Sequence, residues 1–133
     1  MSDRFSEAPI SQLIGFHVLP ATEEDRTLGR AIVELAVDTR LHNPMGRMHG
    51  GVLAALADAA MGIAFGRTLD AGQDFSTIDL HIHFMRPVVS KRLIATGKLI
   101  QRGLRVGFIE CQIHDDRGRH ICSSSCSCTV LQE

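Results

Sequence analysis

The segment from Gly50 to Gly66, GGVLAALADAAMGIAFG, constrains the fold more than any other part of the chain. It is rich in Ala, Leu and Met and contains no Pro, which predicts one helix that begins after the glycines and ends near Gly66. Arg67, which follows, suits a helix C-terminus. Because apolar residues occupy every face, the helix is expected to be buried all round. The rest of the chain must then surround it.

Most of the remaining chain is predicted to form strands. Residues 77–84 alternate in polarity, as in a half-buried strand that ends before Pro87. The predicted apolar face comprises Ile78, Leu80, Ile82 and Phe84, and the polar face comprises Thr77, Asp79, His81 and His83. Residues 30–38, 92–101, 105–114 and 120–131 are extended by composition, with a hairpin turn at 115–118. A short helical turn is expected at 10–14, after Pro9.

These elements predict an α+β fold in which a curved antiparallel sheet wraps around one long central helix. The chain has 133 residues of even composition, without repeats or linkers, so we expect a single domain over residues 1–133. A hydrophobic content of 44% with 22% charged residues is typical of a globular protein.

Charge and hydropathy exclude several partners. A net charge of -1 and a pI near 6.6 argue against a nucleic-acid-binding surface. The longest apolar run, residues 52–57, is too short to span a bilayer, and the first residues lack the apolar core of a signal peptide. We therefore expect a cytoplasmic protein with no membrane partner. The four cysteines are interpreted as thiols that fill the core, Cys111, Cys122, Cys126 and Cys128.

Asp58 is the one ionisable residue between Gly50 and Gly66. A carboxylate in apolar surroundings loses its hydration, so an unpaired one is rarely tolerated without a reason. One interpretation is structural, with Asp58 accepting hydrogen bonds from the backbone or from an arginine across a subunit interface. The other is functional, because perturbed carboxylates concentrate at functional sites.

The loop before the helix supports the functional interpretation. It contains the polar and glycine residues Asn43, Pro44, Gly46, His49, Gly50 and Gly51. The first N–H groups of a helix have no internal partners and carry its positive dipole end, so they could bind a polarised carbonyl. Asp58 lies eight residues after Gly50, about 12 Å along the axis. Two copies packed side by side would bring Asp58 of one chain to the Gly50 end of the other, which predicts a symmetric dimer.

Four features together resemble a known family: the run Asn43-Pro-Met-Gly46-Arg-Met-His49-Gly50-Gly51, Asp58, the run Ser76-Thr77-Ile-Asp79, and a strand ending Arg86-Pro87. Over residues 13–131 the chain resembles hotdog-fold thioesterases of the phenylacetic-acid-degradation (PaaI-like) type. The resemblance implies a hydrolase that cleaves an acyl-coenzyme A thioester to free acid and CoA. It also implies dimers that pair into a homotetramer, with active sites between subunits and no cofactor beyond the CoA of the substrate.

The resemblance also implies roles for single residues. The Gly50 N–H would polarise the thioester carbonyl, Asn43 would assist, and His49 would brace the loop or the carbonyl. Asp58 of the partner chain would be the nucleophile or the general base for a water that Thr77 helps to place. Substrate contacts are expected at Gly51, Leu53, Met61, Phe65, Arg86 and Pro87.

Positive charge gathers in the second half of the chain. No acidic residue lies between Leu80 and Ile109, whereas six basic residues do: Arg86, Lys91, Arg92, Lys98, Arg102 and Arg105. They could bind the phosphates of CoA, with Arg86 the first candidate, or they could be solvated strand ends and turns.

Other functions stay open at this stage. A catalytically silent hotdog protein could bind acyl-CoA without cleaving it. Hotdog folds also include hydratases and dehydratases, but their pattern places an Asp before the Asn and a His soon after the Pro, whereas here His42 precedes Asn43 and His49 comes late. A metal at His81 and His83 lacks further ligands at zinc spacing. Aryl-acetyl, hydroxybenzoyl and medium-chain fatty acyl groups all remain possible substrates.

Overall fold

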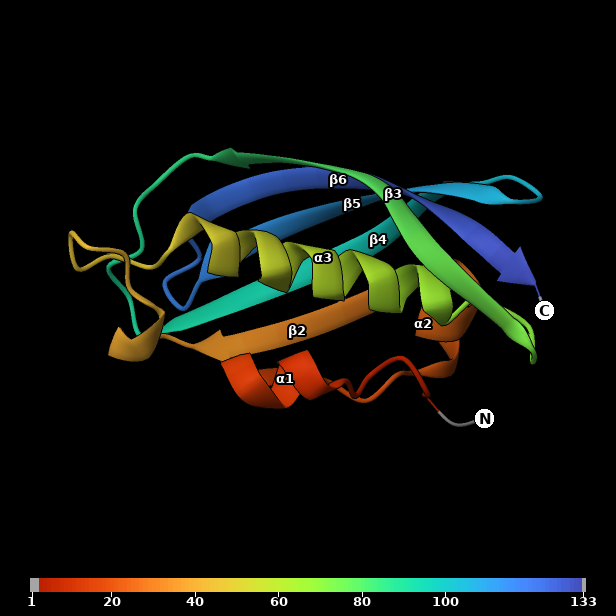
Figure 1. Ribbon diagram of the computed structural model, residues 1–133, viewed down its shortest axis with the longest axis horizontal. Helices are drawn as coiled ribbons and strands as arrows, with labels where there is room; N and C mark the ends of the chain where they lie inside the picture. The colour runs from red at the N-terminus through yellow and green to blue at the C-terminus, as the bar shows by residue number, and fades with distance from the viewer. Residues whose placement is uncertain (1–2, 133) are drawn as a thin grey trace.

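The computed structural model describes residues 3–132, and within them the strands form one six-stranded antiparallel sheet that curls around a long helix (Figure 1). Across the sheet the strand order is β1-β2-β4-β5-β6-β3, so β1 and β3 are its edges. The predicted α+β wrap is confirmed. The elements in chain order are α1 (Pro9–Ile14), β1 (Phe16–Val18), α2 (Glu23–Leu28), β2 (Arg30–Ala36), η1 (Thr39–Leu41), α3 (Gly50–Gly66), β3 (Gln73–Phe84), β4 (Arg92–Arg102), β5 (Val106–Asp115) and β6 (His120–Gln132).

Helix α3 ends where its sequence predicts, at Gly66, but it begins at Gly50 with His49 as its N-cap, so both glycines belong to its first turn. One side of it packs against β2, β4 and β5 and forms the centre of the core. The buried apolar residues of this side include Leu53, Leu56, Ala57, Ala60, Met61, Ala64 and Phe65.

The expectation that α3 is buried all round is wrong for the single chain. Gly51 and Asp58 are exposed, and Ala55 and Ala59 are only partly buried. In Figure 1 the sheet lies behind α3, and β3 crosses in front of it only near its C-terminal end. The sheet therefore covers one side of the helix and leaves a strip of small residues uncovered. We call Gly51, Ala55, Asp58 and Ala59, which follow the helical repeat, the open face of α3.

Gly97 on β4 allows α3 to approach the sheet closely. A Cβ at this position would lie 2.4 Å from the carbonyl oxygen of Ala60. Because the clash is with backbone, neither element could relieve it by a side-chain rotation. The Gly97→Ala variant is therefore expected to lose at least about 2 kcal/mol of unfolding free energy, measured by urea unfolding. Gly103→Ala, in the exposed β4–β5 turn, is the control and should lose less; equal losses would contradict this explanation.

The predicted strands agree with the structure to within about two residues at their ends, except for β3, which begins at Gln73 rather than at residue 77 and differs in its facing. The register between β3 and β6 shifts between Thr77 and Asp79, which is a β-bulge around Ile78. Ile78 is consequently 58% exposed, although alternation placed it on the apolar face, and Phe84 is 54% exposed. Thr77, predicted on the polar face, instead faces α3. Leu80 and Ile82 pack against the core as predicted.

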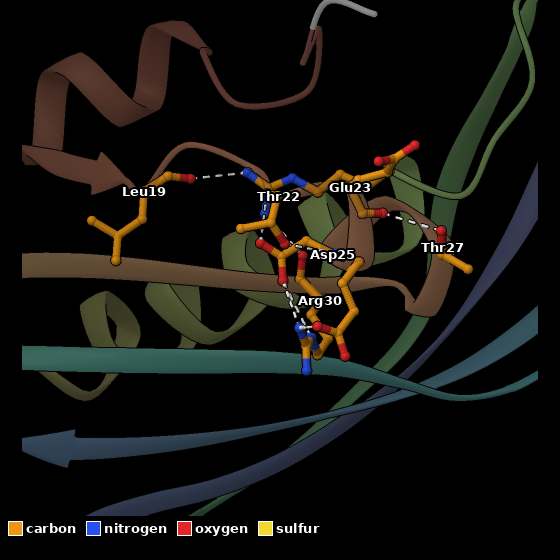
Figure 2. A network of polar contacts seen from close by, with 8 residues as sticks. Leu19, Thr22, Glu23, Asp25, Thr27 and Arg30 are labelled. Atoms are coloured by element: carbon orange, nitrogen blue, oxygen red, sulfur yellow. Dashed lines mark hydrogen bonds and ion pairs between the residues drawn. The ribbon is translucent and has the colours of Figure 1, made fainter.

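Two N-terminal elements, β1 and α2, were not predicted. The start of α2 is fixed by a capping box: the Thr22 hydroxyl accepts a hydrogen bond from the Asp25 N–H at 3.0 Å, and the Asp25 carboxylate accepts one from the Thr22 N–H at 2.9 Å. Figure 2 shows this pair, and Arg30 of β2 reaching the same carboxylate. The Thr22-x-x-Asp25 spacing and the following Gly29 are the sequence signals that would have revealed α2.

The predicted turn at 115–118 and the four thiols are confirmed. The Asp115 carboxylate accepts hydrogen bonds from the backbone N–H groups of Arg117 and Arg119 and closes the β5–β6 turn. All four cysteines are free and buried. Burial raises the pKa of Cys111 to about 12 and that of Cys122 to about 11, so both stay protonated at neutral pH. Across residues 3–132, no helix combines the length and apolar character needed to cross a bilayer.

Candidate active site

Asp58 lies on the open face of α3 and meets Thr77 of β3. The Thr77 hydroxyl donates a hydrogen bond to Asp58 Oδ1 over 3.3 Å. The bulge at Ile78 turns Thr77 toward the helix, so a local irregularity of β3 creates this contact. The structure thus brings together two of the residues predicted for catalysis.

The surroundings of Asp58 favour its neutral form. Desolvation by neighbouring apolar groups raises the pKa of the Asp58 carboxyl above its ordinary value, and the hydrogen bond from Thr77 offsets part of that increase. Within residues 3–132, the described contact of its oxygens is the Thr77 hydrogen bond, and no basic side chain shifts its pKa. The carboxylate is therefore both unpaired and accessible, which is typical of a functional group rather than a structural one.

A cavity of about 200 Å³ adjoins this carboxylate. Apart from Asp58, Thr77 and Ser11 its walls are apolar, so it suits an apolar ligand with a reactive group at the Asp58 end. Its lining residues are Phe5, Ala8, Ile10, Ser11, Phe16, Ala55, Asp58, Ala59, Gly62, Ile63, Phe75 and Thr77.

At the other end of the open face, the start of α3 presents a free backbone donor. His49 caps the helix by accepting a hydrogen bond from the Gly51 N–H at 2.8 Å on its Nδ1. His49 thus braces the loop, and the Gly51 N–H is occupied. In the described part of the chain, the Gly50 N–H has no hydrogen-bond partner. Gly50 is therefore the unsatisfied donor at the positive end of the α3 dipole.

Asn43 shapes the loop that leads to this donor. Its side-chain Oδ1 accepts hydrogen bonds from the backbone N–H groups of Met45 and Arg47, each at 3.0 Å. Gly46 turns the loop with a φ of +80°. These two bonds occupy the amide oxygen, so the amide nitrogen of Asn43, a donor, is the part of the side chain left for a ligand.

The remaining candidates for substrate contact fall into two groups. Leu53, Met61 and Phe65 are buried in the core and do not line the cavity beside Asp58. Arg86 and Pro87 lie exposed in the segment after β3. Sequence reasoning missed the N-terminal wall of the cavity, above all Phe5 and Phe16. The only sequence signal for it was that six phenylalanines are the only aromatic residues besides histidine.

The basic residues between Leu80 and Ile109 do not form one cluster of free charges. Arg92 pairs with Glu34 at 2.6 Å, and Arg102 donates to the Thr68 hydroxyl at 3.0 Å. His81, which with His83 has too few neighbouring ligands in the sequence for a zinc site, lies 3.9 Å from Asp79 on the exposed side of β3. Among residues 3–132, no three His, Cys, Asp or Glu side chains gather closely enough to hold a metal ion.

Comparison with known proteins assigns the class. The sequence model of the thioesterase superfamily matches residues 45–122, which include the loop from Met45 on, α3, the whole of β3, β4 and β5, and the start of β6. The chain belongs to this superfamily, and the predicted class, a thioester hydrolase, is confirmed.

Individual proteins are similar to this chain in sequence, in fold or in both. A 1,4-dihydroxy-2-naphthoyl-CoA hydrolase of Listeria monocytogenes is 26% identical over 105 residues, covering 79% of this chain and 85% of that protein. The crystal structure of BH2602 from Bacillus halodurans with CoA is 28% identical, with a TM-score of 0.84 over 96% of this chain and 81% of that one. The PaaI protein of the Escherichia coli phenylacetic acid degradation operon has a TM-score of 0.84 at 21% identity, covering 96% and 88%. The hotdog fold and the PaaI-like resemblance are thereby confirmed.

Proposed function

We propose that this protein hydrolyses acyl-coenzyme A thioesters to a free acid and CoA, at a site shared between two subunits. The observation that carries the proposal is the unpaired, accessible Asp58 carboxylate on the open face of α3, next to an apolar cavity. The names of similar proteins support the substrate class, because one is a hydrolase of an acyl-CoA and another was crystallised with CoA.

Thioester hydrolysis needs an attacking oxygen and a donor for the developing oxyanion. Asp58 would supply the first, either by attacking the carbonyl carbon or by taking a proton from an attacking water. The Gly50 N–H would supply the second, with the amide nitrogen of Asn43 assisting. In the first route, breaking of the C–S bond leaves the acyl group on Asp58 as a mixed anhydride, which a water then hydrolyses to the free acid and the Asp58 carboxylate, and the CoA thiolate takes a proton from that water. In the second route, the oxygen of the water becomes part of the free acid, and the proton that Asp58 took from the water passes to the departing CoA thiolate. His49, by occupying the Gly51 N–H, would keep the loop in place.

The two groups lie about 12 Å apart along one helix, too far to act on one bond. A second copy would resolve this. The open face of α3 carries small residues that allow a partner helix to approach, and β3 is an edge strand that could pair with its own copy. In such a dimer Asp58 of one chain would face Gly50 of the other. A pairing of dimers into a homotetramer, a cytoplasmic location and the absence of a cofactor stay predictions.

In the bound substrate, the CoA moiety would extend out of the site and lie along exposed residues of the protein surface. Arg86 and Pro87 follow β3 and lie on the surface, and Arg86 is our first candidate for a phosphate contact. Arg92 and Arg102 are weaker candidates because their guanidinium groups already have partners in this chain.

The direct test is release of free thiol from a panel of acyl-CoAs, comprising short, medium and long saturated chains together with phenylacetyl and hydroxybenzoyl groups. Hydrolysis of at least one member at an enzymatic rate is expected. Binding of acyl-CoA with no thiol release from any member would contradict the proposal and favour a silent binding protein. Hydration of an enoyl-CoA without thiol release would favour the hydratase.

The Thr77→Val variant tests the contact with Asp58 through pH. Activity needs the carboxylate, so it falls as the pH decreases through the Asp58 pKa, which is already raised in the native protein. Valine removes the one hydrogen bond that lowers this pKa. The acid limb of the kcat/KM profile is therefore expected to move to higher pH, and the plateau to fall about tenfold. An acid limb that stays in place or moves to lower pH would contradict this role of Thr77.

A further inference from the structure

Part of the wall of the cavity beside Asp58 comes from the first described residues of the chain. Phe5 lines it together with Phe16 of β1 and Phe75 of β3, while Asp58 and Thr77 lie on its wall as the reactive pair. Asp58 is the one ionisable residue among those that line the cavity. An acyl chain that extends from a carbonyl at Asp58 would run toward these rings.

Phe5 is packed firmly against the helix and β3. Its ring centroid lies 5.2 Å from that of Phe75, in an edge-to-face arrangement. A Cβ at Gly66 would come within 2.5 Å of the Phe5 ring, so the glycine makes room for it. The ring therefore occupies a fixed place against the C-terminal end of α3.

The residues just before Phe5 hold it in position through hydrogen bonds to the rest of the domain. The Asp3 carboxylate accepts hydrogen bonds from Arg67, at 2.6 Å from Nη2 and 3.2 Å from Nε. The Arg67 side chain is only 1% exposed and also donates to two backbone carbonyls, so it forms a rigid anchor. Arg4 donates to the carbonyl of Gln73, and its guanidinium lies 4.4 Å from the centroid of the Phe5 ring.

We propose that Phe5 is the end wall of the acyl pocket and sets the longest acyl chain the enzyme accepts, with the Asp3–Arg67 pair as the group that positions it. The inference rests on the proposed function, because it takes the acyl group of acyl-CoA to occupy the Asp58 cavity. At about 200 Å³ the cavity is smaller than typical sites for drug-sized ligands, which are roughly 300–1,000 Å³. It therefore fits a compact apolar acyl group, and the native enzyme discriminates against long chains.

The test compares kcat/KM for saturated acyl-CoAs from butyryl to lauroyl in the native protein and in Phe5→Ala. Each additional methylene of the acyl chain that becomes buried in the pocket is expected to increase the affinity roughly fourfold. The ratio of lauroyl to butyryl activity is expected to rise by about tenfold or more in Phe5→Ala. Asp3→Asn, which weakens the anchor but keeps the ring, should shift the ratio in the same direction by less. Phe108→Ala, at a 41% exposed phenylalanine outside the cavity, is the matched control and should leave the ratio unchanged.

Binding of non-hydrolysable S-alkyl-CoA thioethers, measured by calorimetry on the same variants, separates this inference from the proposed function. A chain-length limit that shifts in Phe5→Ala supports the end wall even if no thioester is cleaved. An unchanged chain-length profile in both Phe5→Ala and Asp3→Asn, in hydrolysis and in binding, overturns it while leaving the proposed function standing.

Discussion

The Asp58→Asn variant is expected to lose at least about two orders of magnitude in kcat for acyl-CoA hydrolysis. Asparagine keeps the shape of the side chain and can still accept the hydrogen bond from Thr77, but it cannot attack a carbonyl as a carboxylate or take a proton from water. The loss should be the same for every acyl group that the native protein cleaves. Thiol release under saturating substrate measures it.

The free energy of unfolding of Asp58→Asn distinguishes a loss of catalysis from damage to the fold. Because the folded-state pKa of Asp58 is raised above its unfolded value, ionised Asp58 opposes folding at neutral pH, and this penalty vanishes as the pH falls below the unfolded pKa. Asp58→Asn should therefore be at least as stable as the native protein at neutral pH. Asp116→Asn, at an exposed residue of the β5–β6 turn, should retain native activity. An Asp58→Asn variant that keeps both its fold and its activity would contradict the catalytic role, and one that loses its fold would contradict the expected stability.

Gly50→Pro is expected to lower kcat by about 100-fold to 1,000-fold, the usual effect of removing one oxyanion donor. Gly50 is the first residue of α3, the position where helices accept proline, and His49 before it is extended with a ψ of 133°. The substitution therefore removes the free N–H while keeping the helix start.

Gly50→Ala is the matched control for this change. It keeps the N–H and adds a Cβ at about the same place, 3.3 Å from the tip of the Phe84 ring, which is exposed enough to move aside. The difference between the two variants thus isolates the backbone donor. Equal activities of Gly50→Pro and Gly50→Ala would contradict the oxyanion role, whatever their level relative to the native protein.

The helix and its carboxylate could be predicted because their signals are local. Composition predicts the end of α3 at Gly66 and its start to within two residues, and a single Asp in an apolar run stands out without any knowledge of the fold. The side of α3 that stays open could not be predicted, since it depends on how far a sheet of distant strands reaches around the helix. Asp58 was expected to be buried, and it is the open face that makes it accessible.

Two other features of the site depend on structure that alternation does not encode. The bulge at Ile78 reverses the facing of the strand at that point, and it turns Thr77 toward Asp58 rather than away from it. The contact of Phe5 with Phe75 and Gly66 joins residues about half the chain apart. Pairings of this kind arise from tertiary packing, so the N-terminal wall of the cavity had no local signature.

The central claim, that one active site takes Asp58 from one chain and Gly50 from its partner, is tested most directly by mixing two inactive variants. Asp58→Asn and Gly50→Pro chains are co-expressed with different tags, and hydrolysis by the mixed dimers is compared with that of each parent. Random pairing makes half of the dimers mixed, and each mixed dimer has one intact site. The account therefore predicts recovery of about a quarter of native activity. No recovery in purified mixed dimers would show that Asp58 and Gly50 do not act across the subunit interface.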